Sequence, residues 1–238
     1  MYPWIVLVVT VVFFVQVARQ ARASRSRHSL FWAVSLAMAS LATAAYILAA
    51  GTGDAWAFRV YYALGAVAMA AYMGLGSLHL HWRRRSLRAP AAVTGCVVAA
   101  SVVGAGLTFA LPVDAARLAA LEGGPGTGVI SHEGWLGAVW LIDLILLNTF
   151  GVAAMVLVAL ASVFRAYTAG APSGLAWGNG LIAAGGVLLG AAGTAARLGF
   201  PGAFWLVMSL GWIVVYGGFR LVDATLAKER SGAGAAAG

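Results

Sequence analysis

The stretch "YMGLGSLHLHWRRR" at residues 72–85 indicates the fold class of this chain. An apolar, glycine-rich run leads into two histidines, a tryptophan and three arginines. This order is typical of the end of a transmembrane helix, where an aromatic ring lies among the lipid headgroups and the cations that follow lie in cytoplasmic water. The stretch therefore predicts a helix that leaves a membrane on its cytoplasmic side.

The whole chain has the composition that such a helix requires. Of its 238 residues, 62% are hydrophobic and only 9% are charged, whereas a soluble domain carries about 25% charged residues. So few polar side chains cannot cover a globule in water, and most of the surface must face lipid. A single cysteine, Cys96, excludes an internal disulfide and any site built from several cysteines.

Seven apolar segments approach or exceed the roughly 20 residues that cross a hydrocarbon core. They lie at residues 4–18, 29–50, 57–79, 90–111, 135–164, 175–197 and 201–222. The sequence thus predicts an all-α, polytopic membrane protein in which a seven-helix transmembrane bundle at 1–224 precedes a short, disordered cytoplasmic tail at 225–238.

Basic residues gather in alternate links between these segments. Twelve of the 15 lysines and arginines lie in the first, third and fifth links and in the tail. Because cytoplasmic links are rich in basic residues, this pattern predicts an N-terminus outside and a C-terminus inside. The arginines follow the first apolar run and do not precede it, so this run is predicted to remain as a helix and not to be cleaved as a signal peptide.

Arginine outnumbers lysine 14 to 1, and alanine and glycine are abundant. This usage indicates a bacterial genome rich in G and C, and hence a multi-pass protein of the bacterial inner membrane. The net charge of +8 follows from the topology, and no basic-aromatic module for nucleic acid is visible. The expected partners are the lipid bilayer and either another membrane protein or a second copy of the chain.

Three segments carry side chains at helical spacing on one face. In the third segment these are Tyr62, Gly65, Met69, Tyr72, Gly76 and His79, and in the sixth they are Asn179, Ala183, Gly186, Gly190, Gly193 and Arg197. Small residues at this spacing let helix backbones approach closely in lipid. The seventh segment has an aromatic face that predicts either bundle core or a ligand-lining wall: Trp205, Ser209, Trp212 and Tyr216. The first segment is nearly featureless and is expected to be peripheral.

Asp143 is the one acidic residue inside a spanning run. Ionisable groups within a membrane are costly and point to function. The carboxylate is expected to pair with Arg197 or Arg59, while a ligand or proton site and simple exposure at the interface stay open. The candidate ligand-binding site, near the outer surface, consists of Asp143, Arg197, Arg59, Tyr62, Tyr72, Trp140 and Trp212. No catalytic residue and no metal site is predicted.

The longest link is "PVDAARLAALEGGPGTGVISHEG" at residues 112–134. Its first half can form a short helix, and its glycine-rich second half is a turn. It is either an external loop resting on the headgroups or a lid over an outward pocket.

The histidines offer one alternative site. His79 and His81 point about 200° apart around a helix, so they cannot share a ligand. His28 opens the second segment on the same side as His79, and two histidines from facing helices could ligate a haem. A haem is kept only as an alternative, and no cofactor is predicted. Lys228, the only lysine, follows the seventh segment, which leaves no buried lysine for a retinal Schiff base.

The stretch "YYALGAVAMAAYMGLGSLHLHWRRR" at 61–85 resembles the third helix of uncharacterised bacterial seven-helix integral membrane proteins. The likeness rests on paired tyrosines, a small-residue face and an arginine exit. It covers about one helix and implies no activity.

These features favour a non-enzymatic protein that binds a small ligand or serves as a sensor or accessory subunit. The alternatives are a small-solute transporter and a haem-binding subunit for electron transfer.

Overall fold

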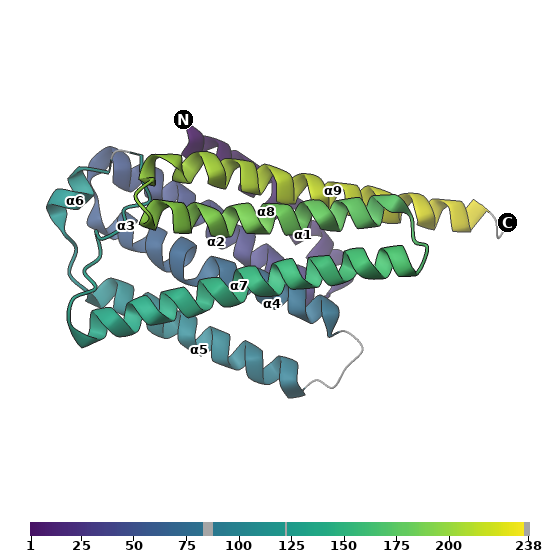
Figure 1. The fold of residues 1–238 in the computed structure, drawn as a ribbon, viewed down its shortest axis with the longest axis horizontal. Helices are drawn as coiled ribbons and strands as arrows, with labels where there is room; N and C mark the ends of the chain where they lie inside the picture. The colour runs from purple at the N-terminus through teal and green to yellow at the C-terminus, as the bar shows by residue number, and fades with distance from the viewer. Residues whose placement is uncertain (83–87, 122, 236–238) are drawn as a thin grey trace.

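The computed structural model describes residues 1–82, 88–121 and 123–235. Its described residues are helical apart from short links and one isolated bridge between Val113 and Ile130. The helices (Figure 1) are α1 (Tyr2–Ser24), α2 (Arg27–Thr52), α3 (Ala55–Tyr61), the π-helix η1 (Tyr62–Ala68), α4 (Met69–His81), α5 (Arg88–Ala110), α6 (Ala115–Ala119), α7 (Gly134–Thr168), α8 (Ser173–Arg197), the 3-10 helix η2 (Pro201–Ala203) and α9 (Phe204–Ala235).

Seven helical segments are long and apolar enough to cross a membrane, which confirms the predicted fold class. Each predicted segment falls within one of them, apart from Leu111, which directly follows the fourth. The third span is one continuous helical rod from Ala55 to His81, made of α3, η1 and α4. Within lipid a helix satisfies its own backbone hydrogen bonds, so length and apolarity are enough to form these segments.

Six of the long helices form a closed ring. Going around it, α1 packs on α2, α2 on α4, α4 on α7, α7 on α8, α8 on α9, and α9 on α1. The fourth long helix in sequence order, α5, lies outside the ring against α7 and η1 (Figure 1). The end of the ring that carries α6 and the link from 111 to 133 is called the loop end below.

The first span is one of the two least buried of the seven, as its featureless sequence predicted, but it also closes the ring between α2 and α9. The helix α1 packs on α2 and α9 and carries a row of buried side chains: Val6, Thr10, Phe13 and Val17. The hydroxyl of Ser40 in α2 donates to Thr10 at 3.1 Å. Because α5 lies outside the ring and packs on it from one side, its valines at 102 and 103 are exposed.

The helices α4 and α7 cross with their backbones in contact. A Cβ atom on Gly74 would lie 2.8 Å from the Cα atom of Gly151, and a Cβ atom on Gly151 would overlap the carbonyl group of Ala70. Helices in lipid associate through such close packing because no hydrophobic effect drives them together. This crossing therefore requires glycine at both positions.

A second close contact joins α8 to α9. A Cβ atom on Gly185 would lie 2.8 Å from the backbone nitrogen of Val215, and Gly178 is equally close to Gly218. The glycine face predicted from the sequence lies beside this one on α8 and packs against α7. The ideal Cβ positions of Gly186 and Gly190 each lie 3.1 Å from a methyl carbon of a valine in α7. Two small-residue rows run along α8, and the row not singled out makes the tighter contact.

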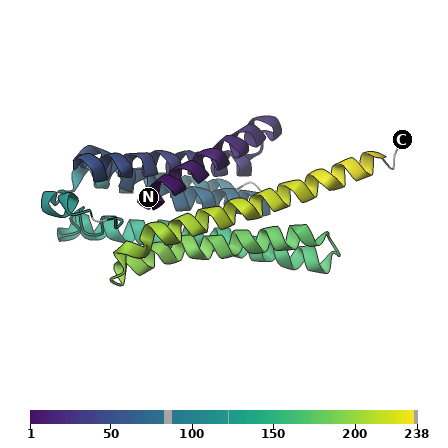
Figure 2. The ribbon, with the colours of Figure 1, turned by 90° about the horizontal axis from the view of Figure 1, so that it is seen from above.

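The tail also differs from expectation. The sequence predicted disorder from residue 225, but α9 continues to Ala235 and extends past the other helices (Figures 1 and 2). The segment "ATLAKER" at 224–230 is rich in strong helix formers, which prolong the helix beyond its apolar part. Residues 236–238 and the predicted arginine exit at 83–85 lie outside the described residues.

We expect Gly151→Ala to lower the free energy of unfolding by about 1–3 kcal/mol, because overpacking forces the two backbones apart. Thermal unfolding in detergent micelles measures the effect. The matched control is Gly95→Ala in the middle of α5, where an added Cβ meets nothing within 4 Å. This control should be neutral or stabilising by up to about 1 kcal/mol. Equal midpoints for the two variants would contradict the close crossing.

Candidate functional site

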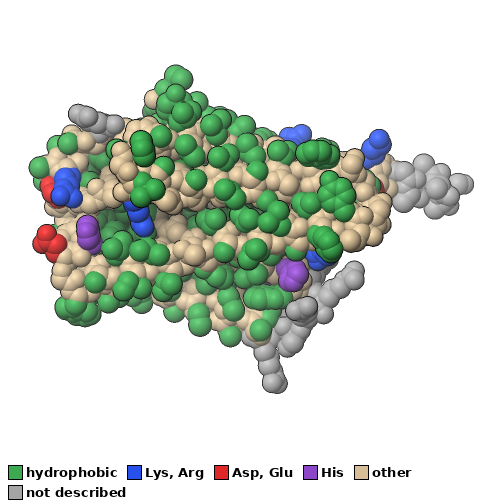
Figure 3. Space-filling view, viewed as in Figure 1, with side chains coloured by type: hydrophobic (Ala, Val, Ile, Leu, Met, Phe, Trp, Pro, Cys, Tyr) green, Lys and Arg blue, Asp and Glu red, His purple; other side chains and the backbone are tan. Residues whose placement is uncertain are grey.

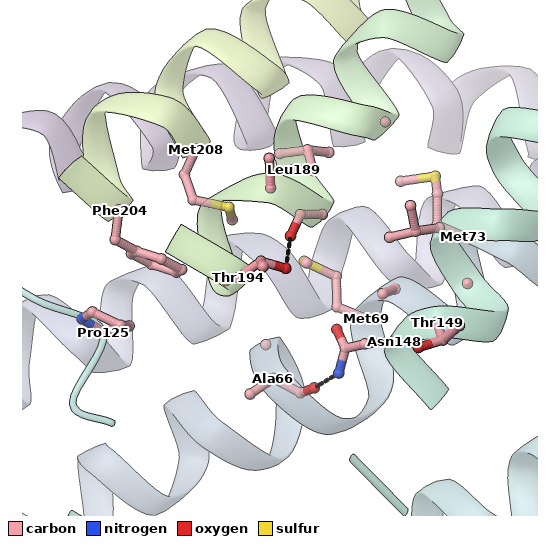
Figure 4. A pocket seen from close by; sticks show the side chains of 18 of the residues that line it. Ala66, Met69, Met73, Pro125, Asn148, Thr149, Leu189, Thr194, Phe204 and Met208 are labelled. Atoms are coloured by element: carbon pink, nitrogen blue, oxygen red, sulfur yellow. Dashed lines mark hydrogen bonds between the residues drawn. The ribbon is translucent and has the colours of Figure 1, made fainter. Parts of the chain in front are cut away.

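A cavity of about 1040 Å³ lies inside the helix ring. Small-molecule sites typically measure about 300–1,000 Å³, so this cavity is at the upper end of that range. Its walls come from α2, the α3–η1–α4 rod, α7, α8 and α9, and Pro125 and Thr127 of the long link complete it at the loop end. Figure 4 shows how side chains from these elements surround the space.

The cavity opens sideways between α7 and α8. Lining residues on both helices are also exposed on the outside of the bundle, with Leu157 of α7 at 64% and Val187 of α8 at 54%. The space-filling view is hollowed between these two helices (Figure 3). Because both helices are membrane spans, this opening faces lipid.

The interior is hydrocarbon-like and adaptable. Four of the six methionines of the chain line it: Met69, Met73, Met155 and Met208. Three of them are labelled in Figure 4, on opposite walls of the space. Methionine is unbranched and polarisable, so a wall of methionines can fit ligands of different shapes. Rings of Phe204, Trp205 and Trp212 add a rigid aromatic wall from α9.

Most polar side chains in the lining are bonded to backbone carbonyls. The hydroxyl of Ser35 donates to the Met69 carbonyl at 2.7 Å, and that of Thr43 donates to Ala39 at 2.8 Å. Thr194 donates to the Gly190 carbonyl at 3.2 Å. These donors are occupied, so they add little polarity to the cavity wall.

Asn148 ties α7 to the π-helix. Its amide nitrogen donates to the Leu144 carbonyl at 2.8 Å and to the Ala66 carbonyl within η1 (Figure 4). A π-helical turn is rare and is frequently found at functional sites. Here it carries Tyr62, Gly65 and Ala66 on the cavity wall.

Arg197 is the one charged side chain among the described lining residues. It is the last residue of α8, at the loop end, and it is exposed. No hydrogen bond or salt bridge joins it to another described residue.

The long link covers the loop end of the cavity. The hydroxyl of Tyr46 donates to the Gly124 carbonyl at 2.7 Å, and that of Tyr61 donates to Pro125 at 3.2 Å. These bonds fold the glycine-rich half of the link back onto the bundle. Of the two interpretations of this link, the structure thus favours the lid.

Three of the seven predicted site residues line the cavity: Tyr62, Arg197 and Trp212. Three others face α5, namely Asp143, Arg59 and Trp140. The ring of Tyr72 packs on that of Phe31, with 6.1 Å between the ring centres. Successive helical residues point about 100° apart, so α7 presents residue 143 to α5 and residues 144 and 148 to the cavity.

Thr108 of α5 joins three helices. Its hydroxyl accepts from the Trp140 indole at 2.9 Å and donates to the Gly104 carbonyl at 2.8 Å. Its carbonyl accepts from the Arg59 guanidinium. These bonds attach α5 to the ring from outside.

The expected ion pairs of Asp143 are not formed. Its Oδ2 atom is buried against Gly104, where no Cβ would fit, and has no hydrogen-bond partner among the described residues. Arg59 donates to the Thr108 carbonyl instead, and Arg197 belongs to the cavity. The salt bridge found in the described part of the chain joins Arg117 to Asp114 at 3.2 Å.

The histidines of the haem alternative have other neighbours. The Nε2 atom of His79 lies 3.0 Å from the Thr94 hydroxyl, and its ring stacks on Phe31 at 5.0 Å. The Nε2 atom of His28 lies 3.2 Å from the Ser29 hydroxyl. The described residues contain no group of three or more metal-ligating side chains. Haem binding stays a hypothesis.

Sequence reasoning missed several lining residues, above all Met73, Asn148, Met155 and Met208. Each lies within an apolar span, where its type does not distinguish a cavity wall from packed core. Their shared environment exists only once the ring closes.

Comparison of the chain with protein-family models, with curated proteins and with solved structures found no match. The resemblance of residues 61–85 to a helix of bacterial multi-pass proteins therefore stays a prediction.

We expect Thr108→Val to destabilise the protein by about 1–3 kcal/mol, because it leaves the buried Trp140 indole without an acceptor. The change preserves the size of the side chain. Thr168→Val is the control, since that hydroxyl is exposed and bonds only within α7, and it should cost no more than about 0.5 kcal/mol. Thermal midpoints in detergent compare the two variants, and equal midpoints would contradict the role of Thr108.

Proposed function

We propose that this protein binds a lipophilic molecule within its helix ring and acts as a non-enzymatic binding protein. The observation that carries the proposal is the cavity of about 1040 Å³, with a methionine-rich wall and an opening toward lipid. A ligand dissolved in the bilayer could enter it without passing through water.

The physical basis of selectivity differs from that of a water-facing pocket. A hydrocarbon chain that moves from lipid into the cavity exchanges one apolar environment for another, so the hydrophobic effect contributes little. Affinity must come from close contact with the wall and from the few polar groups at its edge. The methionines supply adaptable contact, and the aromatic rings of α9 supply a rigid surface.

A role as a sensor or accessory subunit fits this site. Near the cavity, valine side chains of α7 pack against glycines of α8. This contact borders the opening. Occupancy of the cavity would favour one spacing of these helices, which a neighbouring membrane protein could detect.

The binding test uses a long-chain fatty alcohol that carries a photoactivatable diazirine, with the protein in lipid nanodiscs. We expect saturable labelling of cavity residues such as Met69 and Met208, above the labelling of Leu146, an α7 residue that faces lipid. Peptide mass spectrometry measures both.

Gly193→Phe should reduce the cavity labelling about tenfold, because Gly193 lines the cavity and open space surrounds its ideal Cβ position. Gly180→Phe is the matched control: the same substitution on the same helix, also with open space around it, but outside the lining. It should leave the labelling unchanged. Equal labelling of Met69 and Leu146 in the unmodified protein would refute the proposal.

We further propose that the protein lies in a bacterial inner membrane with its N-terminus outside and its C-terminus in the cytoplasm. The alternating arginines support this orientation. The high ratio of arginine to lysine supports the bacterial origin.

Cysteine labelling tests the orientation in intact bacterial cells. In a Cys96→Ser background, His132→Cys should react with a membrane-impermeant maleimide, and Lys228→Cys should react only after lysis, since both positions are exposed. The reverse pattern would contradict the orientation alone. Reaction of both from the same side would contradict three spans between them.

A further inference from the structure

We infer that the occupant of the cavity is an anionic amphiphile whose acidic headgroup binds Arg197 and whose hydrocarbon chain extends into the ring. This inference rests on the proposed function and specifies the class of ligand. Arg197 carries it, as the one charged side chain that the described lining places at the end of an otherwise apolar space.

The guanidinium of Arg197 has hydrogen-bonding capacity to spare. It offers five N–H donors in a planar fork, and none of them is bonded to another described residue. Its helix does not need it as a cap: the backbone nitrogens of Leu198 and Phe200 already bond the Thr194 and Ala195 carbonyls, each at 3.0 Å. A positive charge at the end of a helix also favours the helix dipole, but that interaction does not occupy the donors.

The chemistry of this group selects the headgroup. The planar fork of arginine matches the two oxygens of a carboxylate or a phosphate, with two parallel charge-assisted bonds. Tyr62 lines the same cavity, and its hydroxyl donates to the Gly126 carbonyl at 3.4 Å. A neutral headgroup would leave the charge without a counterion.

The depth of the cavity fits a single hydrocarbon chain. The lining extends along α8 from Gly186 to Arg197 and includes Leu198 just after the helix. The eleven steps from Gly186 to Arg197 correspond to about 16 Å at 1.5 Å per residue. This length is roughly half of a hydrocarbon core about 30 Å thick. A lipid of one leaflet would thus keep its headgroup at the level of Arg197 while its chain reached the methionines.

The acidic group could belong to a free fatty acid or to an anionic phospholipid, and both share the chemistry described above. The experiment uses three diazirine probes in nanodiscs at alkaline pH: a fatty acid, a phosphatidylglycerol, and the fatty alcohol as the uncharged reference. At least one anionic probe should label Met69 and Met208 about tenfold more than the alcohol at equal concentration. Labelling by the fatty acid alone identifies a carboxylate ligand, and labelling by the phospholipid identifies a phosphate.

Arg197→Gln should remove this preference, so that the anionic probes label no better than the alcohol, and Arg197→Lys should retain part of it. Arg117→Gln, an exposed arginine of the same end that lies outside the cavity lining, should have no effect and controls for net charge. Labelling of Arg197→Gln by the alcohol shows that the variant is folded. If the variant is not labelled by the alcohol, the preference of the unmodified protein for anionic probes over the alcohol tests the inference.

Equal cavity labelling by charged and uncharged probes, or a preference unchanged in Arg197→Gln, would overturn this inference and leave the proposed function intact. Cavity labelling no greater than that of Leu146 with every probe would overturn both.

Discussion

The contact on which the rest of the structure depends is the crossing of α4 and α7 at Gly74 and Gly151. At this point two backbones touch, with no room for a single Cβ atom. In lipid, where apolar side chains gain nothing by leaving the solvent, such contact is the main source of helix association. The crossing sets the height of α7 along α4. It thereby brings Asn148, which lies three residues before Gly151, to the Ala66 carbonyl.

A second backbone contact, at Gly178 and Gly218, holds α8 against α9. The ring thus contains two tightly joined pairs, α4 with α7 and α8 with α9. Between the pairs, α7 meets α8 through valine side chains near Gly186 and Gly190. Side chains can change rotamer, whereas touching backbones cannot yield without separating the helices. The contact of α7 with α8 is therefore the most adaptable part of this wall, and it borders the opening of the cavity to lipid.

The polar groups of the spans serve two separate purposes. Those around Thr108 attach α5 to the outside of the ring, and they include the Trp140 indole and the Arg59 guanidinium. Asp143 belongs to this outer contact, because it faces Gly104 of α5. On the cavity side, hydroxyls and the Asn148 amide bond to carbonyls of the bundle. This division leaves Arg197 as the charge available to a ligand and explains why one predicted site became two.

The sequence by itself determined the seven spans, because in lipid a segment that is long and apolar enough must satisfy its backbone hydrogen bonds within its own helix. Spacing along each helix also placed Tyr62, Arg197 and Trp212 on faces that were expected to meet other helices. Only the tertiary structure decided which helix each face meets. Two glycine rows on α8 were each compatible with close packing, and Asp143 was compatible with either arginine. The cavity itself is a property of the closed ring: it depends on the shapes of five distant segments together, and no local pattern in any one of them specifies the space left between them.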